Sequence, residues 1–530
     1  MLQRFLKNIE PVVFLVSGAM IALFLMFGAL FTGTADRLFG NVQSFVVDFF
    51  GWFYILAASV FVIFVLWLLL SRYAKIRLGG DDAKPEFSYG AWFSMLFSAG
   101  MGIGLVYYGV AEPMTHYLNP PIAAPESAAA VTEAFRFTFF HWGLHPWAIY
   151  IVFGLSLAYF HFRYDLPLTP RSVFYPLLGK RIYGPAGHAI DTLAVIATLF
   201  GLATSLGLGV MQINTGLGQI AGVAQGTWIQ VLLIAIITGI ATVSVVSGLD
   251  GGIKRISQFN VLLAVILMVF VLLVGPTIYL LNTFVGNVGN YVQNLAFLSF
   301  WTGAGTDGGF QTGWTLFYWG WWISWAPFVG IFIARISKGR TIREFILGVL
   351  FVPTIVTFLW LSVFGGTGLF MERNGIAAIA AANNESATLS LYAVLGALPL
   401  GGVLTVLFTI LVASFFVTSS DSGSLVIDMI TSGGNPEPPV AQRVFWALTE
   451  GAVAAVLLLA GGLGALQTAA ITSGLPMAIL MVFMCFSLVK ALRIDIATGQ
   501  RVPSLDELSA KTDAAQRQGG GRGQPQGSGD

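Results

Sequence analysis

The chain has 530 residues, of which 56% are hydrophobic and 10% are charged, and its formal net charge at pH 7 is +1. Soluble globular proteins have about a quarter of their residues charged, so this composition excludes that class. The single cysteine, Cys485, also excludes a framework of disulfide bonds.

Apolar runs of about 20 residues recur along the chain, and each can cross a hydrocarbon core of about 30 Å as a helix. The predicted fold class is therefore an all-α polytopic membrane protein with twelve transmembrane helices. The spans are predicted at residues 12–31, 49–70, 91–113, 137–160, 191–216, 228–247, 259–282, 313–336, 345–369, 400–428, 444–463 and 470–492.

The segments between these spans alternate in basic charge. Of the 26 Lys and Arg residues, all but Arg37, Arg136 and Arg373 fall in one of the two alternating sets of segments. Loops on the cytoplasmic side of a membrane carry the excess of Lys and Arg. Both termini are therefore predicted to be cytoplasmic, in a multi-pass protein of the cell (inner) membrane.

Three segments are not predicted to span the membrane. A short N-terminus, 1–11, precedes the twelve-helix domain at 12–492, and a cytoplasmic tail, 493–530, follows it. The end of the tail is rich in Gly and Gln and lacks an apolar period, which is typical of disorder. The polar stretch 282–300 is expected to form an amphipathic helix along the outer surface.

The third span contains the glycine-rich stretch "SAGMGIGLVYYG", with glycine at 100, 102, 104 and 109. Each glycine inside a helix costs about 1 kcal/mol relative to alanine. Close helix packing is one explanation for such a run. The other is a helix that unwinds around a ligand and directs its carbonyls at a cation and its amides at a carboxylate.

The fourth and eighth spans each carry an aromatic face. These faces are formed by Trp142, Trp147 and Tyr150 in one span and by Trp321, Trp322 and Trp325 in the other. On a helix the first three lie at about 0°, 140° and 80°, although Pro146 is expected to kink that span. A headgroup belt or simple core packing are the alternatives, but most of these rings lie away from the span ends. Two opposed aromatic faces can hold a quaternary ammonium by cation–π attraction, worth about 2 kcal/mol per ring when dry.

The tenth span ends in a hydroxyl-rich stretch, "ASFFVTSSDSGSLVID". Hydroxyl groups in membrane helices often only bond the carbonyl four residues earlier. The alternative is a sodium site, because a hard monovalent cation prefers several neutral oxygen ligands, and a broken third span opposite would supply carbonyls.

Several ionisable residues lie within or beside the predicted spans. Glu112 is expected to end the helix of the third span, and Glu450, about two turns inside the eleventh, is a candidate proton relay. His141 and His145 are four residues apart, a spacing seen in metal sites, but no HExxH frame surrounds them. They are therefore expected to pack in the core with hydrogen-bond partners.

Four stretches together resemble the betaine/choline/carnitine transporter family, and the resemblance extends over all twelve spans. The stretches are "AGMGIGLVYYGVAEP" (99–113), "HWGLHPWAIY" (141–150), "YWGWWISWAPFVGIFIARISKGRTIREF" (318–345) and "FFVTSSDSGSL" (415–425). The resemblance implies a transporter rather than an enzyme, without a cofactor, and assembled as a homotrimer in which the segment near 284–300 helps to join protomers. It also implies the inverted-repeat, leucine-transporter-type fold, with two five-helix repeats at about 91–282 and 313–492 after two extra helices at 12–70.

The resemblance also implies roles for individual residues. The substrate cage would consist of Trp142, Trp147, Tyr150 and Trp322, with Trp325 and Trp321 lining the path to the cytoplasm. The substrate carboxylate would be held by amides of the glycine segment, namely Gly100, Met101, Gly102 and Gly104. Sodium would bind oxygens at Ser98, Met101, Phe415, Thr418 and Ser419. A second sodium site would involve Thr198 and Phe328, where this sequence has Leu202 in place of a further hydroxyl.

In this family glycine at position 104 accompanies betaine-like specificity and aspartate accompanies choline uptake. The expected function is therefore import of a quaternary-ammonium osmoprotectant, glycine betaine first, by sodium symport with alternating access. Spans five and eight contain no basic side chain before Arg335, which favours sodium as the coupling ion. The alternative within the family is a proton-coupled or exchange-type transporter of choline or carnitine. A channel and a membrane enzyme are alternatives of other classes.

Overall fold

The computed structural model describes residues 9–100, 102–247, 250–306 and 308–498, without the side chains of 97–100, 244–245, 247, 250–254 and 498. Met101 and the end of the tail, 499–530, therefore lie outside the described residues, as do the side chains of Ser98 and Gly100. Within the described part the chain forms helices and no β-strand, apart from one isolated antiparallel bridge between Arg77 and Thr341. The class predicted from composition, an all-helical chain, is confirmed.

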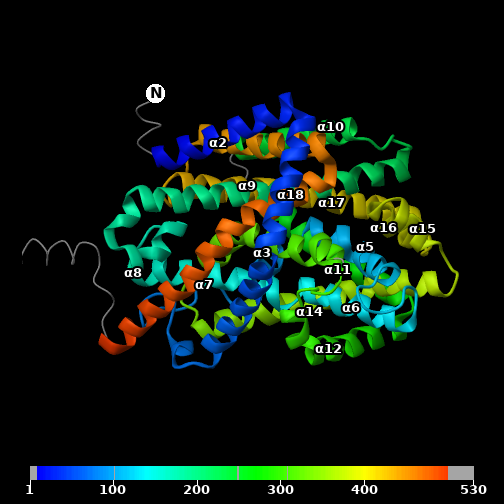
Figure 1. Cartoon of the computed structure of the whole chain (residues 1–530), viewed down its shortest axis with the longest axis horizontal. Helices are drawn as coiled ribbons and strands as arrows, with labels where there is room; N and C mark the ends of the chain where they lie inside the picture. The colour runs from blue at the N-terminus through cyan, green and yellow to red at the C-terminus, as the bar shows by residue number, and fades with distance from the viewer. Residues whose placement is uncertain (1–8, 101, 248–249, 307, 499–530) are drawn as a thin grey trace, which may run out of the picture.

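The first part of the chain forms the helices α2 to α12 (Figure 1). Their bounds are α2 Pro11–Leu30, α3 Thr32–Leu70, α4 Tyr89–Gly100, α5 Ile103–Leu118, α6 Ala128–Trp142, α7 Leu144–Tyr164, α8 Tyr175–Leu178, α9 Pro185–Ala221, α10 Thr227–Ser247, α11 Asp250–Val274 and α12 Thr277–Phe300. Short 3-10 turns lie at Arg72–Lys75, Pro170–Phe174 and Gly179–Tyr183.

The second part forms the helices α13 to α18, after a π-helical turn at Gln311–Leu316. Their bounds are α13 Phe317–Arg335, α14 Ile342–Arg373, α15 Ile379–Glu385, α16 Ala387–Gly396, α17 Gly401–Thr431 and α18 Val440–Thr498. Helix α14 begins with a capping box, in which the Thr341 hydroxyl accepts from the Glu344 amide and the Glu344 carboxylate accepts from the Thr341 amide.

Nine helices of the described part are long and apolar enough to cross a membrane, compared with the twelve spans predicted. The difference arises at three places. The third predicted span is divided between α4 and α5, of 12 and 16 residues, and α10 counts only as a shorter apolar helix. Helix α18 counts once, although it covers the last two predicted spans and has non-helical backbone at Gly461 and Gly462. The number twelve stays a prediction.

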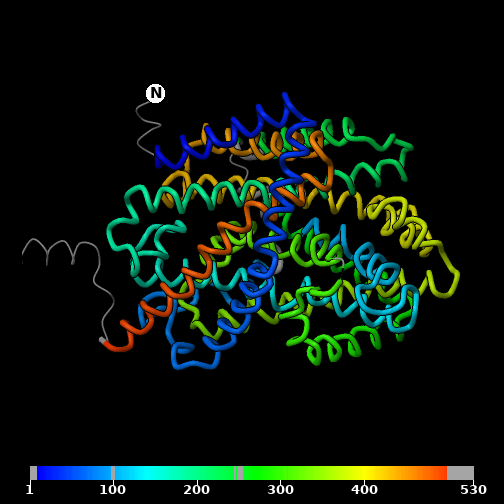
Figure 2. Tube along the Cα trace, viewed as in Figure 1, coloured from blue at the N-terminus to red at the C-terminus, as the bar shows by residue number. Residues whose placement is uncertain are grey.

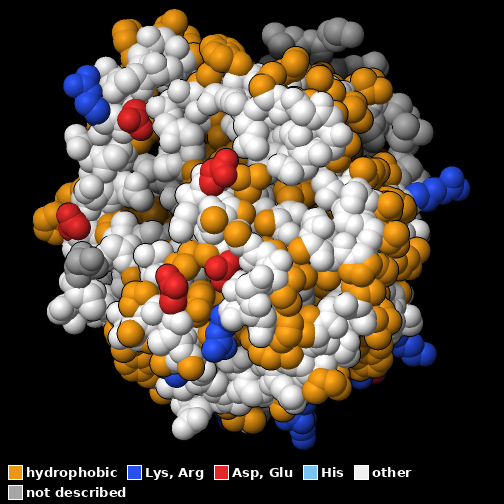
Figure 3. Space-filling view, turned by 90° about the vertical axis from the view of Figure 1, so that its right-hand side faces the viewer, with side chains coloured by type: hydrophobic (Ala, Val, Ile, Leu, Met, Phe, Trp, Pro, Cys, Tyr) orange, Lys and Arg blue, Asp and Glu red, His pale blue; other side chains and the backbone are white. Residues whose placement is uncertain are grey.

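The helices are arranged around a buried centre. In Figure 1, α2 and α10 lie along one edge and α12 lies along the opposite edge. Helix α9 runs beside α2, and α3 and the end of α18 cross the molecule obliquely. The start of α2 and the end of α18 lie toward the same end of the long axis (Figure 2). Large apolar side chains are exposed on the outer helices, among them Leu23, Trp228 and Leu273. A lipid-facing surface has this character, because hydrocarbon accepts apolar side chains but not charges. The end face in Figure 3, by contrast, carries acidic and basic side chains as well as hydrophobic ones.

The central pair of helices is α7 and α13, which are buried along almost their whole length. Their backbones come together at Gly154 and Gly330, where a Cβ on Gly154 would lie 3.0 Å from the Gly330 carbonyl oxygen. Small residues permit such close approach of two membrane helices. This contact fixes how the aromatic faces of α7 and α13 meet.

Two local predictions are wrong. The fourth predicted span is broken at Gly143, with φ −94° and ψ −129°, rather than kinked at Pro146. Pro146 lies in the first turn of α7, where a backbone N–H has no carbonyl acceptor within the helix. A proline there therefore removes no helical hydrogen bond. Glu112 does not end its helix, because α5 continues through Pro113 to Leu118. Neighbouring helices in a membrane protein support such an internal proline. Helix α14 packs directly against this turn of α5, because a Cβ on Gly365 would lie 2.7 Å from Pro113 Cγ and 3.0 Å from the Gly109 carbonyl oxygen, which Pro113 leaves without its helical donor.

Candidate functional site

The aromatic residues predicted to form a cage lie in one contiguous cluster. The ring centroids of Trp142 and Trp322 are 5.0 Å apart and their planes make an angle of 71°. Tyr150 lies 6.3 Å from Trp322, and Trp147 lies 5.6 Å from Tyr150, both in edge-to-face contact. All four side chains are buried. Helices α6, α7 and α13 therefore bring together rings that are up to 180 positions apart in the sequence.

The two other tryptophans of α13 extend this cluster. Trp321 stacks on Trp322 with centroids 4.6 Å apart and an angle of 15° between the planes. Trp325 contacts Phe328, one turn further along α13, at 5.2 Å. Offset and edge-to-face pairs of this kind contribute about 0.5–1.5 kcal/mol beyond their buried area. Trp321 thus belongs to the ring cluster, and Trp325 joins it as part of the same cavity lining.

The indole N–H groups are held from outside the cluster. Trp322 Nε1 donates to the His141 carbonyl oxygen (3.0 Å), Trp321 Nε1 donates to Ser205 Oγ (3.2 Å) and Trp142 Nε1 donates to Glu112 Oε2 (2.7 Å). These bonds fix the ring orientations and leave the ring faces free. By contrast, Trp325 Nε1 and Tyr150 Oη are buried without a partner among the described residues.

A small cavity lies between these rings and the broken third span. It measures about 10 Å³ and is lined by Gly102, Ile103, Gly104, Leu105, Trp142, Ser205, Trp321, Trp322, Trp325 and Ser419. A cavity of this size holds about one water molecule. In this conformation the aromatic surfaces are closed on each other, and a trimethylammonium group needs the rings or the glycine segment to move apart.

The break in the third span lies beside this cavity. Helix α4 ends at Gly100 and α5 begins at Ile103, with Gly102 in an extended conformation at φ −158° and ψ −147°. Two residues after the break, Gly104 lies directly under the rings, because a Cβ there would be 2.5 Å from Trp321 Cη2 and 3.1 Å from Trp142 Cη2. The prediction of a broken helix is confirmed for the described backbone, and Gly104 is required by this close approach.

The residues predicted for sodium are only partly brought together. Ser419 lines the same cavity as Gly102. Thr418 Oγ1 contacts backbone oxygens of its own helix, Ser414 O at 3.1 Å and Phe415 O at 3.2 Å, and accepts from Asn260 Nδ2 at 3.4 Å. Its hydroxyl is thus already used in the ordinary way for a membrane helix.

The second predicted sodium site has the same character. Thr198 Oγ1 donates to Ala194 O at 2.7 Å, one turn earlier in α9. Leu202 packs its methyl groups against α17, since a Cβ on Gly423 would lie 2.4 Å from Leu202 Cδ1. Phe328 is buried on α13, which packs against α9. The leucine therefore fills space at the position where a hydroxyl was expected.

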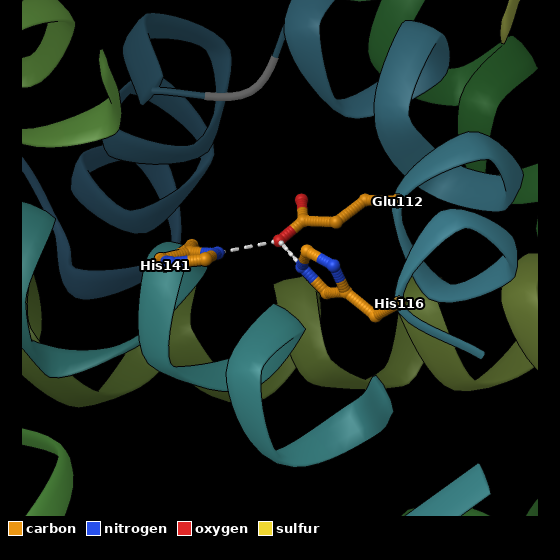
Figure 4. A group of neighbouring side chains, drawn as sticks. All are labelled: Glu112, His116 and His141. Carbon is orange, nitrogen blue, oxygen red and sulfur yellow. Dashed lines mark hydrogen bonds and ion pairs between the residues drawn. The ribbon is translucent and has the colours of Figure 1, made fainter. Parts of the chain in front are cut away.

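A buried polar network behind the cage was not predicted from the sequence. Glu112 Oε1 lies 2.7 Å from His141 Nδ1 and 3.2 Å from His116 Nε2. Figure 4 shows Glu112 and His116 extending from α5 toward His141 on α6. The only signal available was a glutamate inside an apolar span, which by itself marks a functional position.

The same three residues have the donor set of a divalent transition-metal site, with ligand atoms within 4.8 Å of one another. They also bond each other directly, and His141 Nε2 is paired with Thr315 Oγ1 at 3.1 Å. His141 and His145 were predicted to pack in the core with hydrogen-bond partners. His145 Nε2 lies 3.2 Å from Ser299 Oγ, whereas His141 pairs with Glu112 and Thr315, so the two imidazoles do not share a partner.

The family that this arrangement points to is that of the betaine/carnitine/choline transporters, whose sequence model matches residues 12–497. The chain belongs to this family of membrane transporters. It is 46% identical to a glycine betaine transporter of Acinetobacter baylyi, over 93% of this chain and 75% of that protein. It is 44% identical to a glycine betaine transporter of Bacillus subtilis, over 95% of this chain and 98% of that protein. It is 48% identical to an uncharacterized transporter of Mycobacterium tuberculosis, over 94% of this chain and 85% of that protein.

Proposed function

We propose that this transporter imports glycine betaine, or a closely similar trimethylammonium zwitterion, by sodium symport with alternating access. The observation that carries the proposal is the contiguous cluster of Trp142, Trp147, Tyr150 and Trp322, whose indole N–H groups at 142 and 322 are bonded away from the cavity. Aromatic faces attract a quaternary ammonium and need no carboxylate in contact with it. The glycine betaine transporters among its relatives support the same substrate.

The proposed mechanism begins with the cavity opening. The trimethylammonium group binds between the rings, and backbone amides of the glycine segment, from Gly100 to Gly104, hold the carboxylate. Sodium binds where the broken helix meets α17, at Ser419 with Phe415 and Thr418 and the backbone near Ser98 and Met101. Thr198 and Phe328 are the second, lesser candidate site. Binding of ion and substrate together then favours the inward-open state, because both ligands contact the glycine segment of the third span and each stabilises it for the other.

The assembly and topology belong to the same proposal. The chain would cross the inner membrane twelve times, with both termini cytoplasmic and two inverted five-helix repeats. Homotrimers would form with α12 near the interface, since α12 lies at the periphery (Figure 1). Its residues Val285 and Val292 are 69% and 62% exposed.

Uptake of radiolabelled glycine betaine into proteoliposomes tests the function. An inward sodium gradient is expected to drive saturable uptake, and an equal potassium gradient is not. Trp322→Leu is expected to raise KM about 30-fold, the loss of one desolvated cation–π contact. Phe27→Leu, on α2 and remote from the cage, is the control. Wild-type affinity in Trp322→Leu, or uptake independent of sodium, contradicts the proposal.

Proton-coupled transport is the second candidate. It is favoured by Glu450, which is fully buried in α18 and has Oε1 without a partner among the described residues. A buried ionisable group inside a span is a candidate proton carrier. Uptake driven by a proton gradient in sodium-free buffer, and abolished in Glu450→Gln, would establish this candidate instead.

A further inference from the structure

Glu112 is the centre of a hydrogen-bond network that joins three helices. Its Oε1 is shared by the imidazoles of His116 and His141, as Figure 4 shows. Its Oε2 is 2.7 Å from Trp142 Nε1 and 2.5 Å from Tyr318 Oη. An indole N–H can only donate, so Oε2 accepts there, as expected of an ionised carboxylate.

This network contacts the back of the cage and stays outside the cavity. Glu112 is absent from the cavity lining, whereas its partner Trp142 is part of it. The second partner, Tyr318, stacks on Trp322 with centroids 5.6 Å apart and an angle of 24°. The Glu112 carboxylate therefore holds two rings that contact Trp322: Trp142 edge-to-face and Tyr318 stacked.

The carboxylate of Glu112 is paired with imidazoles rather than with a permanently charged side chain. Among the described residues its ion-pair partners are the two imidazoles, and no Lys or Arg pairs with it. All three side chains are fully buried, so solvent screens the charge only weakly. A negative charge behind an indole strengthens the attraction of the ring face for a cation and does not touch the substrate's own carboxylate.

We propose that Glu112 is a positioning and specificity-determining residue of the cage. It orients Trp142 and Tyr318, and its charge raises the affinity of the closed rings for the positive headgroup. The carboxylate of Glu112 lies one layer behind the cavity lining, so it acts on the positive headgroup through the rings and stays apart from the carboxylate of a zwitterion. The inference rests on the proposed function and assigns to Glu112 a role beyond it.

The test compares glycine betaine with its uncharged-headgroup isostere, 3,3-dimethylbutanoate, in which a carbon replaces the nitrogen. Both compete with radiolabelled betaine for uptake into proteoliposomes. Glu112→Gln is expected to weaken betaine about tenfold and the isostere less than twofold, with Vmax changing less than KM. Glu112→Asp keeps the charge and is expected to keep the ratio of the two affinities within about twofold of wild type.

Two further variants separate charge from position. Tyr318→Phe keeps the charge but removes one bond to the carboxylate, so both ligands are expected to weaken equally, by about threefold. The matched control is Glu133→Gln. Glu133 is a buried carboxylate on α6 that accepts hydrogen bonds from the amides of Ile122 and Ala123, and its replacement is expected to leave the ratio of the two affinities unchanged.

Specific outcomes overturn the inference. If Glu112→Gln weakens both ligands equally, or weakens neither, the charge has no role. If Glu112→Gln does not reach the membrane, an unchanged affinity in Tyr318→Phe overturns the positioning role. If the wild-type protein takes up no betaine at all, the proposed function fails, which is a different result from loss of discrimination in a working transporter.

Discussion

Gly104 and Trp321 are in such close contact that a Cβ on the glycine would lie 2.5 Å from Cη2 of the indole. Gly104→Ala therefore forces the ring, and Trp142 beside it, to move. The expected cost is about 1–3 kcal/mol of stability, as for other overpacked cores, together with weaker betaine binding. Thermal unfolding in detergent and uptake kinetics measure the two effects. Gly239→Ala on α10, which meets no atom within 4 Å, is the control, and equal melting temperatures for the two variants would contradict the prediction.

Gly143 sets the angle between α6 and α7, and hence the relation of Trp142 to Trp147. A Cβ there would lie 2.5 Å from the Phe139 carbonyl oxygen and 2.8 Å from Phe358 Cζ. Because backbone cannot yield as a flexible side chain does, Gly143→Ala is expected to lower stability by about 2 kcal/mol or more. It is also expected to change tryptophan fluorescence, since the cage rings shift. A variant that unfolds and fluoresces like wild type would show that the break tolerates a side chain.

Ser419 lines the cavity next to Gly102, whereas Ser422, one turn on, does not. Under the sodium proposal, Ser419→Ala removes a ligand and shifts the sodium activation curve to about tenfold higher concentration. Ser422→Ala, a serine of similar exposure in the same helix, is expected to leave the curve in place. Sodium-dependent uptake at saturating betaine measures both variants. Identical curves for wild type and Ser419→Ala would remove this residue from the ion site.

Glu450 is fully buried, and Oε2 has one long hydrogen bond, 3.4 Å from Ser420 Oγ. An uncompensated buried carboxylate destabilises a fold, so Glu450→Gln is expected to raise stability by about 1 kcal/mol. Sodium-driven uptake should stay within about twofold of wild type. A lower melting temperature would show that the carboxylate has a stabilising partner, and loss of uptake would favour the proton-coupled candidate.

The sequence predicted the elements whose signals are local. Aromatic residues at helical spacing identified the faces of α7 and α13, and the glycine run identified the break between α4 and α5. The sequence did not predict which side chains from distant segments of the chain contact each other. Nothing in the local pattern distinguishes a glutamate that ends a helix from one that binds Trp142 and Tyr318 of other helices. Proline was likewise the stronger local signal for a kink than Gly143, whose role depends on contacts with α12 and α14.

The hydroxyl-rich end of the tenth span shows the same limit. The crowded hydroxyl groups suggested a sodium site with several neutral oxygen ligands, but a hydroxyl can instead bond a carbonyl of its own helix, as that of Thr418 does. Which hydroxyl is left for an ion depends on side chains such as Asn260, which comes from α11, 158 positions away. Such competition is decided in three dimensions, so the ion-site residues remain predictions.

The contact of Gly154 with Gly330 limits how the molecule can open. Because the two backbones touch there without intervening side chains, α7 and α13 cannot come closer together at this point. Under the proposed function, the cavity would widen by tilting of these helices about the contact, or by movement of the segment around Gly102. A bulkier residue at Gly330, which is not part of the cavity lining, would meet Phe153 and the backbone of Gly154, would separate α7 from α13, and is expected to disturb that movement.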